Sequence, residues 1–430
     1  MSDVQPTDAL ARRLFGRLVL PLALIAMVNA IDRVNISYAA SAMMRDLHFG
    51  PQAFGVGVSA FFVGYLLFQY PHAALLRRVG IKAWLAGSLL LWGLVGLAMA
   101  FVQDAGQFYA LRFLLGVAEA GFAPGVTYIV ARWIPMAHRA RAMGLILSAI
   151  PATLVLGGPL CGWLLSLSNP FALAPWRFMF LLQALPNLFL AAVAFAYFVD
   201  RPAQARWLGP ADRAALPDEA DTSGLAERAP LLPVLLDRRV LACAACWFCV
   251  MTGGYALIFW VPQLVRQLSA SGDELLIGLT SSIPQIGVVL GMLLNARHSD
   301  RSQERLAHFA LATLLAGMAL LVASAVADPL ALLALLTVAG IGIGGAQGVF
   351  WTLPAALGIG GGRAPVRTIA LLNMGGTAGG ILGPALMGWV RESTGSFAAG
   401  VASLAVLLIL AAPVAFFQRK RLTRQTSATS

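Results

Sequence analysis

The sequence predicts an all-α membrane protein whose twelve transmembrane helices form two pseudo-symmetric bundles of six. Three observations support this prediction: charged residues are scarce, apolar stretches recur at bilayer-spanning length, and the two halves resemble each other. Of the 430 residues, 59% are hydrophobic and 11% are charged, whereas about 25% are charged in a typical soluble protein. This composition places the chain in the membrane class.

Each of twelve apolar stretches is long enough to cross the hydrocarbon core, which takes about 20 residues. The expected helices are 18–40, 52–75, 83–102, 107–131, 141–166, 176–199, 238–265, 273–296, 306–327, 329–353, 366–390 and 396–418. They divide the chain into an N-terminus (1–17), a first bundle (18–199), a linker (200–237), a second bundle (238–418) and a tail (419–430). The first stretch exceeds the core of a signal peptide, so we expect it to be a retained transmembrane helix. The linker is rich in proline and mixed charges, as is typical of a solvated connection.

The positions of arginine and lysine predict the orientation. Nearly all of those between the expected helices lie on one side, and the other side has only Arg45, Arg177, Arg266 and Arg391. Because basic residues concentrate on the cytoplasmic side, we expect both termini and the linker to be cytoplasmic. The net charge of +11 does not indicate nucleic-acid binding, because the basic residues are dispersed over short connecting segments.

The two halves repeat one sequence feature at corresponding positions. The fifth expected helix ends with Gly158-Pro159-Leu160-Cys161-Gly162-Trp163, and the eleventh ends with Gly383-Pro384-Ala385-Leu386-Met387-Gly388-Trp389. Internal repeats of this kind are typical of transporters that rock two bundles around a site near the membrane midplane. Glycines at 375, 376, 379, 380 and 383 predict close packing of the eleventh helix against a neighbour.

Four ionisable residues lie well inside the expected helices. Asp32 and Arg33 are in the first helix, and Arg112 and Glu119 are in the fourth. Because ionisable groups at bilayer depth are costly, they are functional candidates by default. Seven residues correspond to nearly two helical turns, so Arg112 and Glu119 share one face. The alternative is a structural charge network that only locks the first and fourth helices together.

The charges of these four residues suggest how transport could be energised. Two cations and two carboxylates leave the empty site neutral, and an organic anion would make it negative unless a carboxylate takes up a proton. Arginine suits an anion site because its planar guanidinium binds a carboxylate bidentately and stays ionised. The four charges are therefore consistent with an anion site at which substrate binding is coupled to proton uptake.

Further polar residues lie on candidate cavity faces of other helices. We expect Tyr65, Tyr255, Gln263, Trp351 and Asn373 to contact substrate, although for each one a hydrogen bond between helices or anchoring at the membrane interface is at least as good an interpretation. The four cysteines, Cys161, Cys243, Cys246 and Cys249, lie in apolar stretches and are interpreted as small apolar packing residues. We therefore expect no metal ion and no cofactor.

The motifs around these residues resemble the anion:cation symporters of the major facilitator superfamily. The resemblance rests on Ile31-Asp32-Arg33-Val34-Asn35, Phe61-Phe62-Val63-Gly64-Tyr65, Arg112 to Phe122, Asp200-Arg201-Pro202-Ala203, and His298-Ser299-Asp300-Arg301 with Glu304-Arg305. It covers nearly the whole chain and is nearest to bacterial tartrate, sugar-acid and aromatic-acid transporters. It implies alternating access with proton-coupled uptake of organic anions. The resemblance implies further that Arg33 and Arg112 bind the substrate carboxylate and that Asp32 and Glu119 are the protonation sites. It also implies roles for Tyr65 and Asn373 in the substrate pocket, and for Asp300 and Arg301 in gating between the bundles.

The chain departs from this family at three positions. Ala30 replaces a usual tyrosine and Ile150 a usual glutamine, and both changes remove hydrogen-bonding groups that would favour a heavily hydroxylated substrate. Arg77 replaces the acidic residue expected in the loop after the second helix, which would weaken one of two charge latches between the bundles.

These observations predict a monomeric, proton-coupled importer of a small organic carboxylate in a bacterial inner membrane, with no enzymatic activity. One alternative is an efflux antiporter of the same fold. Another is a membrane sensor or membrane enzyme, which is disfavoured because the expected helices contain no nucleophile or metal-ligand constellation.

Overall fold

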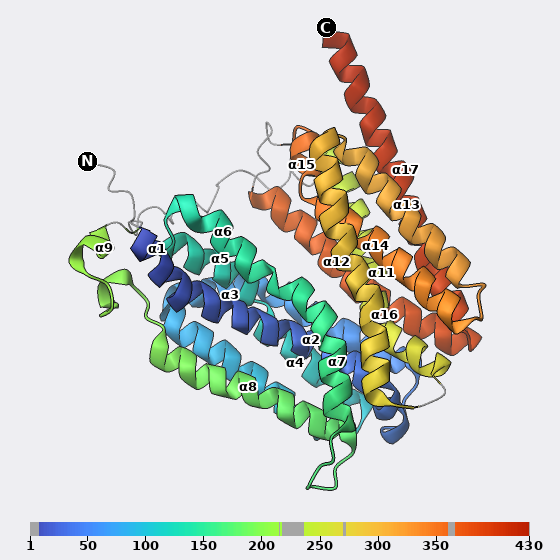
Figure 1. The fold of residues 1–430 in the computed structure, drawn as a ribbon, viewed down its shortest axis with the longest axis horizontal. Coiled ribbons are helices and arrows are strands. Elements are labelled where there is room, and N and C mark those ends of the chain that lie inside the picture. The colour runs from blue at the N-terminus through green and yellow to red at the C-terminus, as the bar shows by residue number, and fades with distance from the viewer. Residues whose placement is uncertain (1–7, 215, 217–235, 270–271, 360–365, 430) are drawn as a thin grey trace. The chain divides into compact units, whose positions relative to one another are not determined.

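A computed structural model describes residues 8–214, 216, 236–269, 272–359 and 366–429 (Figure 1). Within these ranges the regular structure is entirely helical. The first half contains α1 (Asp8–Leu14), the π-helix η1 (Phe15–Val19), α2 (Leu20–Asp46), α3 (Pro51–Met99), α4 (Ala105–Glu119), α5 (Phe122–Trp133), α6 (Met136–Leu147), α7 (Ala149–Ser166) and α8 (Pro175–Tyr197). The short elements η2 (Pro202–Gln204) and α9 (Pro210–Ala214) follow. The second half contains α11 (Arg238–Leu268), α12 (Glu274–Ser302), α13 (Arg305–Ala323), α14 (Pro329–Phe350), α15 (Leu353–Ala356), α16 (Val366–Thr394) and α17 (Phe397–Thr429).

The helices account for all twelve expected spans. Eleven helical stretches of the described chain are long and apolar enough to cross a membrane, and one of these, α3, has 49 residues. A straight helix of that length would measure about 74 Å, more than twice the roughly 30 Å hydrocarbon core. Gly80 has non-helical dihedral angles (φ 84°, ψ 170°), which glycine adopts without strain. The kink there divides α3 into the expected second and third spans.

The fourth span is broken directly after Glu119. The helix α4 ends at this residue and α5 begins at Phe122. Pro124 contributes to the break, because it has no N–H to donate to the carbonyl oxygen of Ala120. Gly121 lies at the break, where a Cβ atom would come within 2.4 Å of Nδ1 of His72. The break therefore places Glu119 at a helix end.

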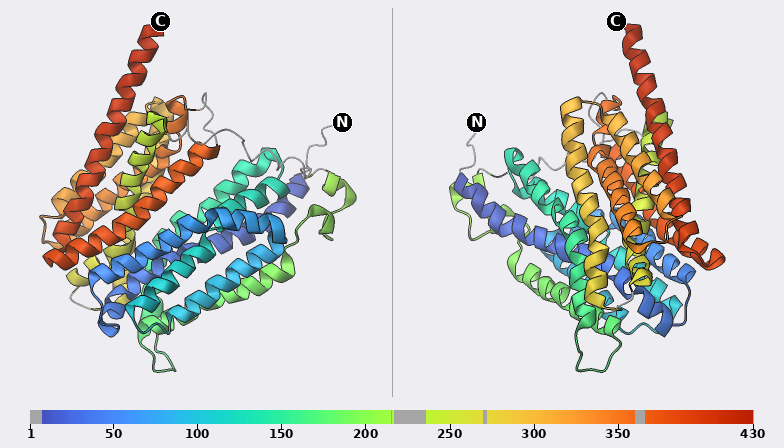
Figure 2. Two further views of the ribbon diagram at one scale, coloured as in Figure 1. Left: turned by 180° about the vertical axis from the view of Figure 1, so that it is seen from behind. Right: turned by 45° about the vertical axis from the view of Figure 1, so that its right-hand side comes forward.

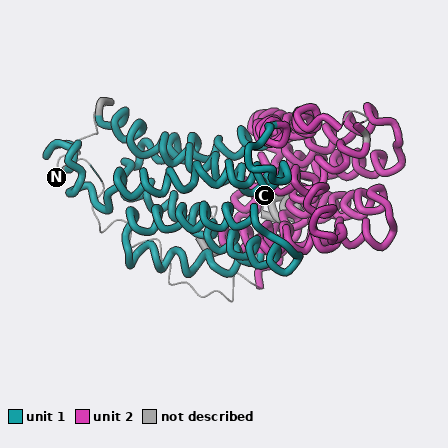
Figure 3. Tube along the Cα trace, turned by 90° about the horizontal axis from the view of Figure 1, so that it is seen from below, with its two compact units in different colours: residues 1–35, 63–154, 167–226 teal, residues 36–62, 155–166, 227–430 magenta. Residues whose placement is uncertain are grey.

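The described chain divides into two compact units, shown in Figure 3. Unit 1 comprises residues 1–35, 63–154 and 167–226, and unit 2 comprises residues 36–62, 155–166 and 227–430. In each unit the helices run side by side (Figure 2). Unit 1 is built around an apolar core that includes Trp84, Trp92 and Trp133. The expected bundle boundaries stay a prediction, since these units are defined by packing in one conformation.

Glycines bring the helices of unit 2 into close contact. A Cβ atom at Gly344 of α14 would lie 1.9 Å from the backbone oxygen of Val288 on α12. On α16, a Cβ at Gly379 would lie 2.7 Å from the backbone oxygen of Phe248, and one at Gly383 would lie 2.3 Å from that of Thr252. Small residues allow such backbone approach in membrane bundles, and the expected close packing of the eleventh span is confirmed.

Unit 2 also contains contacts between spans of the two sequence halves. Gly158 of α7 faces Gly278 of α12, and a Cβ at either position would lie within 2.4 Å of a backbone oxygen on the other helix. At the start of α3, the backbone N–H of Gln52 donates to Oε2 of Glu392 on α16 at 2.8 Å. Within unit 2, the start of α3 therefore contacts α16, and the end of α7 packs closely against α12.

Candidate functional site

The helices α2 and α4 bring the four predicted ionisable residues together in unit 1. Arg33 forms an ion pair with Glu119, with 2.9 Å between Nη2 and Oε2, and its Nε donates to the same oxygen at 3.3 Å. Arg112 and Glu119 are each 1% exposed, whereas the Arg33 side chain is 23% exposed. Asp32 and Arg112 interact electrostatically with the pair. The predicted cluster exists, and Arg33 is its accessible member.

Asp32 contacts α8 as well as the charged residues of α4. The amide Nδ2 of Asn187 donates a hydrogen bond to Oδ2 of Asp32. One turn along, Nδ2 of Asn35 donates to Oε1 of Gln183 at 2.7 Å. All four of these side chains are buried, so they form a polar ladder between α2 and α8.

The sequence analysis missed Gln183 and Asn187. A signal was available, since the two amides are four residues apart and therefore share one helix face. Polar residues within membrane helices commonly form hydrogen bonds between helices. The sequence could not show that this face of α8 meets Asp32.

Tyr65 lies beside the cluster, and its predicted contact with substrate stays a prediction. The guanidinium carbon of Arg33 is 5.2 Å from the centroid of the Tyr65 ring, within the range of a cation–π interaction. The preceding Gly64 permits this proximity, because a Cβ there would lie 2.3 Å from the backbone oxygen of Phe113 on α4. The Phe61–Tyr65 motif therefore places an aromatic ring on the exposed side of Arg33.

A small pocket adjoins the cluster between α2, α3, α4 and α8. Its polar lining is formed by Asp32, Asn35, Arg112 and Gln183, and its apolar lining includes Met99 and Phe180. The pocket has space for about one water molecule. It can hydrate the charges, but it is too small for an organic acid.

The other predicted contact residues lie in unit 2, each in different surroundings. Tyr255 packs against Phe62, with ring centroids 4.5 Å apart. Trp351 is 44% exposed and packs edge-on against Trp247, and Asn373 is exposed. Tyr255, Trp351 and Asn373 thus remain predicted substrate contacts.

Gln263 has a defined partner within unit 2. Its Oε1 accepts a hydrogen bond from Nη1 of Arg391 at 2.9 Å, and the side chain is buried. The guanidinium carbon of Arg391 is also 3.6 Å from the Phe397 ring centroid. The alternative interpretation of Gln263, a hydrogen bond between helices, therefore applies in this conformation, and its contact with substrate stays a prediction.

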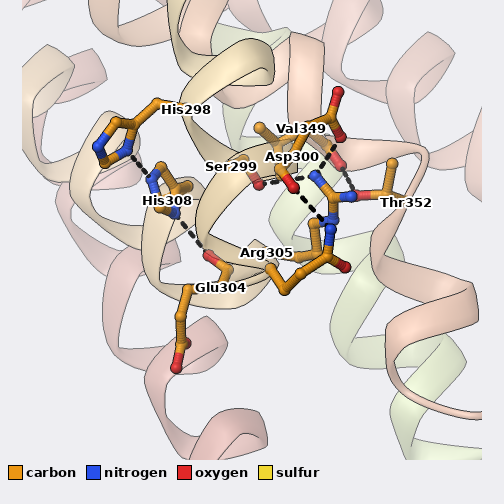
Figure 4. Close-up of polar contacts among 9 residues, drawn as sticks. His298, Ser299, Asp300, Glu304, Arg305, His308, Val349 and Thr352 are labelled. Carbon is orange, nitrogen blue, oxygen red and sulfur yellow. Dashed lines mark hydrogen bonds and ion pairs between the residues drawn. The ribbon is translucent and has the colours of Figure 1, made fainter.

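The predicted gating residues lie at the junction of α12 and α13, shown in Figure 4. The sequence placed Asp300 and Arg301 in a loop after residue 296, but α12 continues to Ser302, so both residues occupy its last turn. Oδ1 of Asp300 is 2.5 Å from Nη1 of Arg305, which also donates to Oγ of Ser299 at 3.1 Å. The Asp300 ion pair is thus formed within unit 2, and a gating role stays a prediction.

A pair of histidines adjoins this ion pair in Figure 4. Nδ1 of His298 and Nε2 of His308 are 2.5 Å apart, and Nδ1 of His308 is 2.6 Å from the backbone oxygen of Glu304. Because a carbonyl oxygen only accepts, Nδ1 of His308 carries a hydrogen, and a neutral His308 ring accepts at Nε2 from His298. Side-chain contacts therefore connect the end of α12 to the start of α13 at two places, the Asp300–Arg305 ion pair and the His298–His308 pair.

Comparisons with known proteins agree with the fold. The sequence profile described as "Major Facilitator Superfamily" matches residues 22–358. The chain is 39% identical over 407 residues to the "Putative tartrate transporter" of Agrobacterium vitis, covering 94% of this chain and 93% of that protein. It is 34% identical to the "Quinolone resistance transporter" of Acinetobacter baumannii, covering 96% of each. Among solved structures, a bacterial homologue of the human lysosomal transporter Spinster, inward-facing and unoccupied, has a TM-score of 0.79 at 16% identity. It covers 94% of this chain and 96% of its own.

The helical fold and the buried charges define a multi-pass membrane transporter. The chain belongs to the Major Facilitator Superfamily, whose members move solutes and are not enzymes. The predictions of fold, of family and of a non-enzymatic function are thereby confirmed.

Proposed function

We propose that this transporter imports a small organic carboxylate together with protons, by alternating access in a bacterial inner membrane with both termini cytoplasmic. The observation that carries the proposal is the buried cluster in unit 1. It combines two arginines and two carboxylates, and Arg112 and Glu119 are almost fully enclosed. A neutral solute would not require two cations at this depth.

The charge of the cluster accounts for the coupling. With both carboxylates ionised, the four residues sum to zero, and an incoming carboxylate adds one negative charge. In a low-dielectric site that charge favours uptake of one proton by Asp32 or Glu119. Substrate and proton would therefore bind together and be released together.

The position of Arg33 suggests how substrate and proton share the site. Arg33 binds Glu119 in this conformation, and a substrate carboxylate would compete for the same guanidinium. A protonated Glu119 loses its charge and frees the Arg33 fork for the substrate. Arg112 would supply the second cationic contact, and Tyr65 would line the pocket beside Arg33.

Two observations narrow the substrate class. Ala30 and Ile150 lack the hydrogen-bonding groups that would favour a polyhydroxylated acid. One relative is described as a "Putative tartrate transporter", and tartrate is a four-carbon dicarboxylate with two hydroxyl groups. A small mono- or dicarboxylate with no more hydroxyl groups than tartrate fits both observations.

An efflux antiporter is the second candidate, and a specific observation favours it. One relative that covers 96% of this chain is described as a quinolone resistance transporter. An efflux pump of this fold would use the proton gradient in the opposite sense, with substrate and proton competing for the site.

Uptake by purified protein in proteoliposomes tests the proposal. A thermal-shift screen against organic acids first selects a labelled substrate, because ligand binding stabilises the folded state by mass action. We expect accumulation when the outside is made acidic, and none in protein-free liposomes. Proton-driven movement of the acid in the opposite direction would establish the antiporter instead.

A further inference from the structure

Asn187 on α8 makes an unusual contact with the proton-coupling aspartate. Its side chain is 1% exposed, and its Nδ2 donates to Oδ2 of Asp32. Its Oδ1 is also buried and makes no hydrogen bond to any described residue. Since buried polar atoms are usually hydrogen-bonded, such an oxygen needs an explanation.

The two protonation states of Asp32 require opposite partners. An ionised carboxylate only accepts hydrogen bonds, whereas a protonated one also carries an O–H donor. A side-chain amide has an N–H donor and a carbonyl acceptor, and half a turn of the amide group exchanges their positions. The unused oxygen of Asn187 is thus available as the acceptor for a protonated Asp32.

We propose that Asn187 is a positioning residue that serves both protonation states of Asp32, and so allows this carboxylate to load and release its proton. The inference rests on the proposed function, in which Asp32 carries a proton. In the ionised state Asn187 donates through Nδ2, and in the protonated state it accepts through Oδ1. No bond to the substrate is required of it.

The neutral hydrogen-bonding partners near Asp32 come from α8. The charged groups near Asp32 are Arg112 and Glu119 on α4 and Arg33 on its own helix, and Tyr65 on α3 faces Arg33. From α8, the nearby side chains are the amides of Asn187 and Gln183. Asn187 is therefore the neutral partner of Asp32 opposite the charged face of the cluster.

The adjoining pocket supplies a place for the proton to leave. Asp32 lines this pocket together with Asn35, Gln183 and Met99, and it accommodates about one water molecule. Met99 is the last residue of α3, so the pocket extends from Asp32 toward that end of the helix. A water held there would be able to exchange a proton with Asp32, beside Arg112, which also lines the pocket.

The test compares coupling with exchange in Asn187 variants of the full-length protein in proteoliposomes. Asn187→Leu keeps the volume and removes both functions of the amide, whereas Asn187→Ser keeps a donor and an acceptor. Two quantities are measured with the selected labelled carboxylate: accumulation driven by an acidic exterior, and counterflow exchange at equal pH. Exchange needs no net proton release, so it isolates movement of the bundles.

We expect Asn187→Leu to exchange substrate within about twofold of wild type and to accumulate it at least tenfold less. Raising the internal pH by about one unit should restore much of the accumulation, because it drives the proton off Asp32. Asn187→Ser should keep most of the accumulation. If the leucine variant does not reach the membrane, Asn187→Ala is compared with Asn187→Ser by the same internal-pH dependence.

Thr153→Val is the matched control for loss of a buried contact with α2. Thr153 lies on α7 and is fully buried, and its hydroxyl is shared between the backbone oxygen of Ala149 at 2.9 Å and that of Met27 on α2 at 3.3 Å. A purely structural contact should lower accumulation and exchange together. If Asn187→Leu behaves like this control, or accumulates substrate like wild type, the inference is overturned. Failure of the proposed function gives a different result, because wild-type uptake would then be independent of the proton gradient.

Discussion

Replacing Gly158 with valine tests the packing that seals α7 against α12. At this position a Cβ atom would lie 2.4 Å from the backbone oxygen of Gly278, 2.4 Å from Oγ of Ser282 and 2.8 Å from Oη of Tyr38. The approach is reciprocal, since a Cβ at Gly278 would lie 2.2 Å from the backbone oxygen of Gly158. Two of the three obstructing atoms, the backbone oxygen of Gly278 and Oγ of Ser282, are on α12. The backbone oxygen cannot rotate away as a side chain can.

The overlap sets the size of the expected effect. Ordinary carbon–oxygen contacts begin near 3.4 Å, so the helices would have to separate by about 1 Å, and overpacking of this kind costs roughly 1–3 kcal/mol. A change of that size alters a conformational equilibrium about 5- to 150-fold. Gly158→Val should therefore disfavour the conformation in which α7 contacts α12, while leaving each helix intact.

Cys161 provides a reporter within the same helix. It lies one turn after Gly158, is fully buried, and is close to Tyr38. With Cys243, Cys246 and Cys249 changed to serine, a membrane-impermeant maleimide applied outside should label Cys161 slowly in the parent protein. In the Gly158→Val protein the labelling should be several-fold faster.

Two further variants test whether faster labelling of Cys161 results from separation of α7 and α12. Gly144→Val on α6 is the matched control, because no atom of the described residues lies within 4 Å of a Cβ there, and its labelling should equal that of the parent. Gly278→Val should reproduce the effect from the facing helix. Unchanged Cys161 labelling and normal transport in folded Gly158→Val protein would refute the reasoning.

Three other predictions concern the charge cluster and its coupling. Arg112→Lys keeps the charge but loses the bidentate guanidinium, so it should mainly weaken substrate affinity. Arg112→Ala should also flatten the pH profile of uptake. Normal affinity in folded Arg112→Ala protein would exclude substrate binding by Arg112. Glu119→Gln should abolish proton-driven accumulation but keep counterflow exchange, and concentrative uptake by this variant would remove Glu119 from the mechanism. Uptake should increase with external acidity. If more protons enter than the substrate has negative charges, an inside-negative potential should also drive uptake, by about 2.3 kcal/mol per net charge per 100 mV. Uptake driven by a sodium gradient at clamped pH would contradict proton coupling.

The sequence determined the architecture because the relevant signals are local. A bilayer-spanning helix requires a continuous apolar stretch, so the spans could be read from composition alone, and even the merged helix α3 contains the two that were expected. Asp32, Arg33, Arg112 and Glu119 stood out for the same reason, since ionisable residues at this depth are costly. Their helical spacing placed Arg112 and Glu119 on one face.

Only the tertiary structure decided which of these groups meet. The sequence allowed a charge network between the first and fourth helices, but it could not show that Arg33 is the residue that pairs with Glu119. Nor could it show that Asp32 accepts a hydrogen bond from Asn187, because both contacts depend on how α2 packs against α4 and α8. It also could not show that Gly158 meets Gly278, or that α12 continues past Asp300 to Ser302. Hydropathy indicates which segments cross the membrane, but most faces of such helices are apolar enough to face lipid. Which helices become neighbours is therefore decided by close backbone approach and by hydrogen bonds between segments distant in sequence.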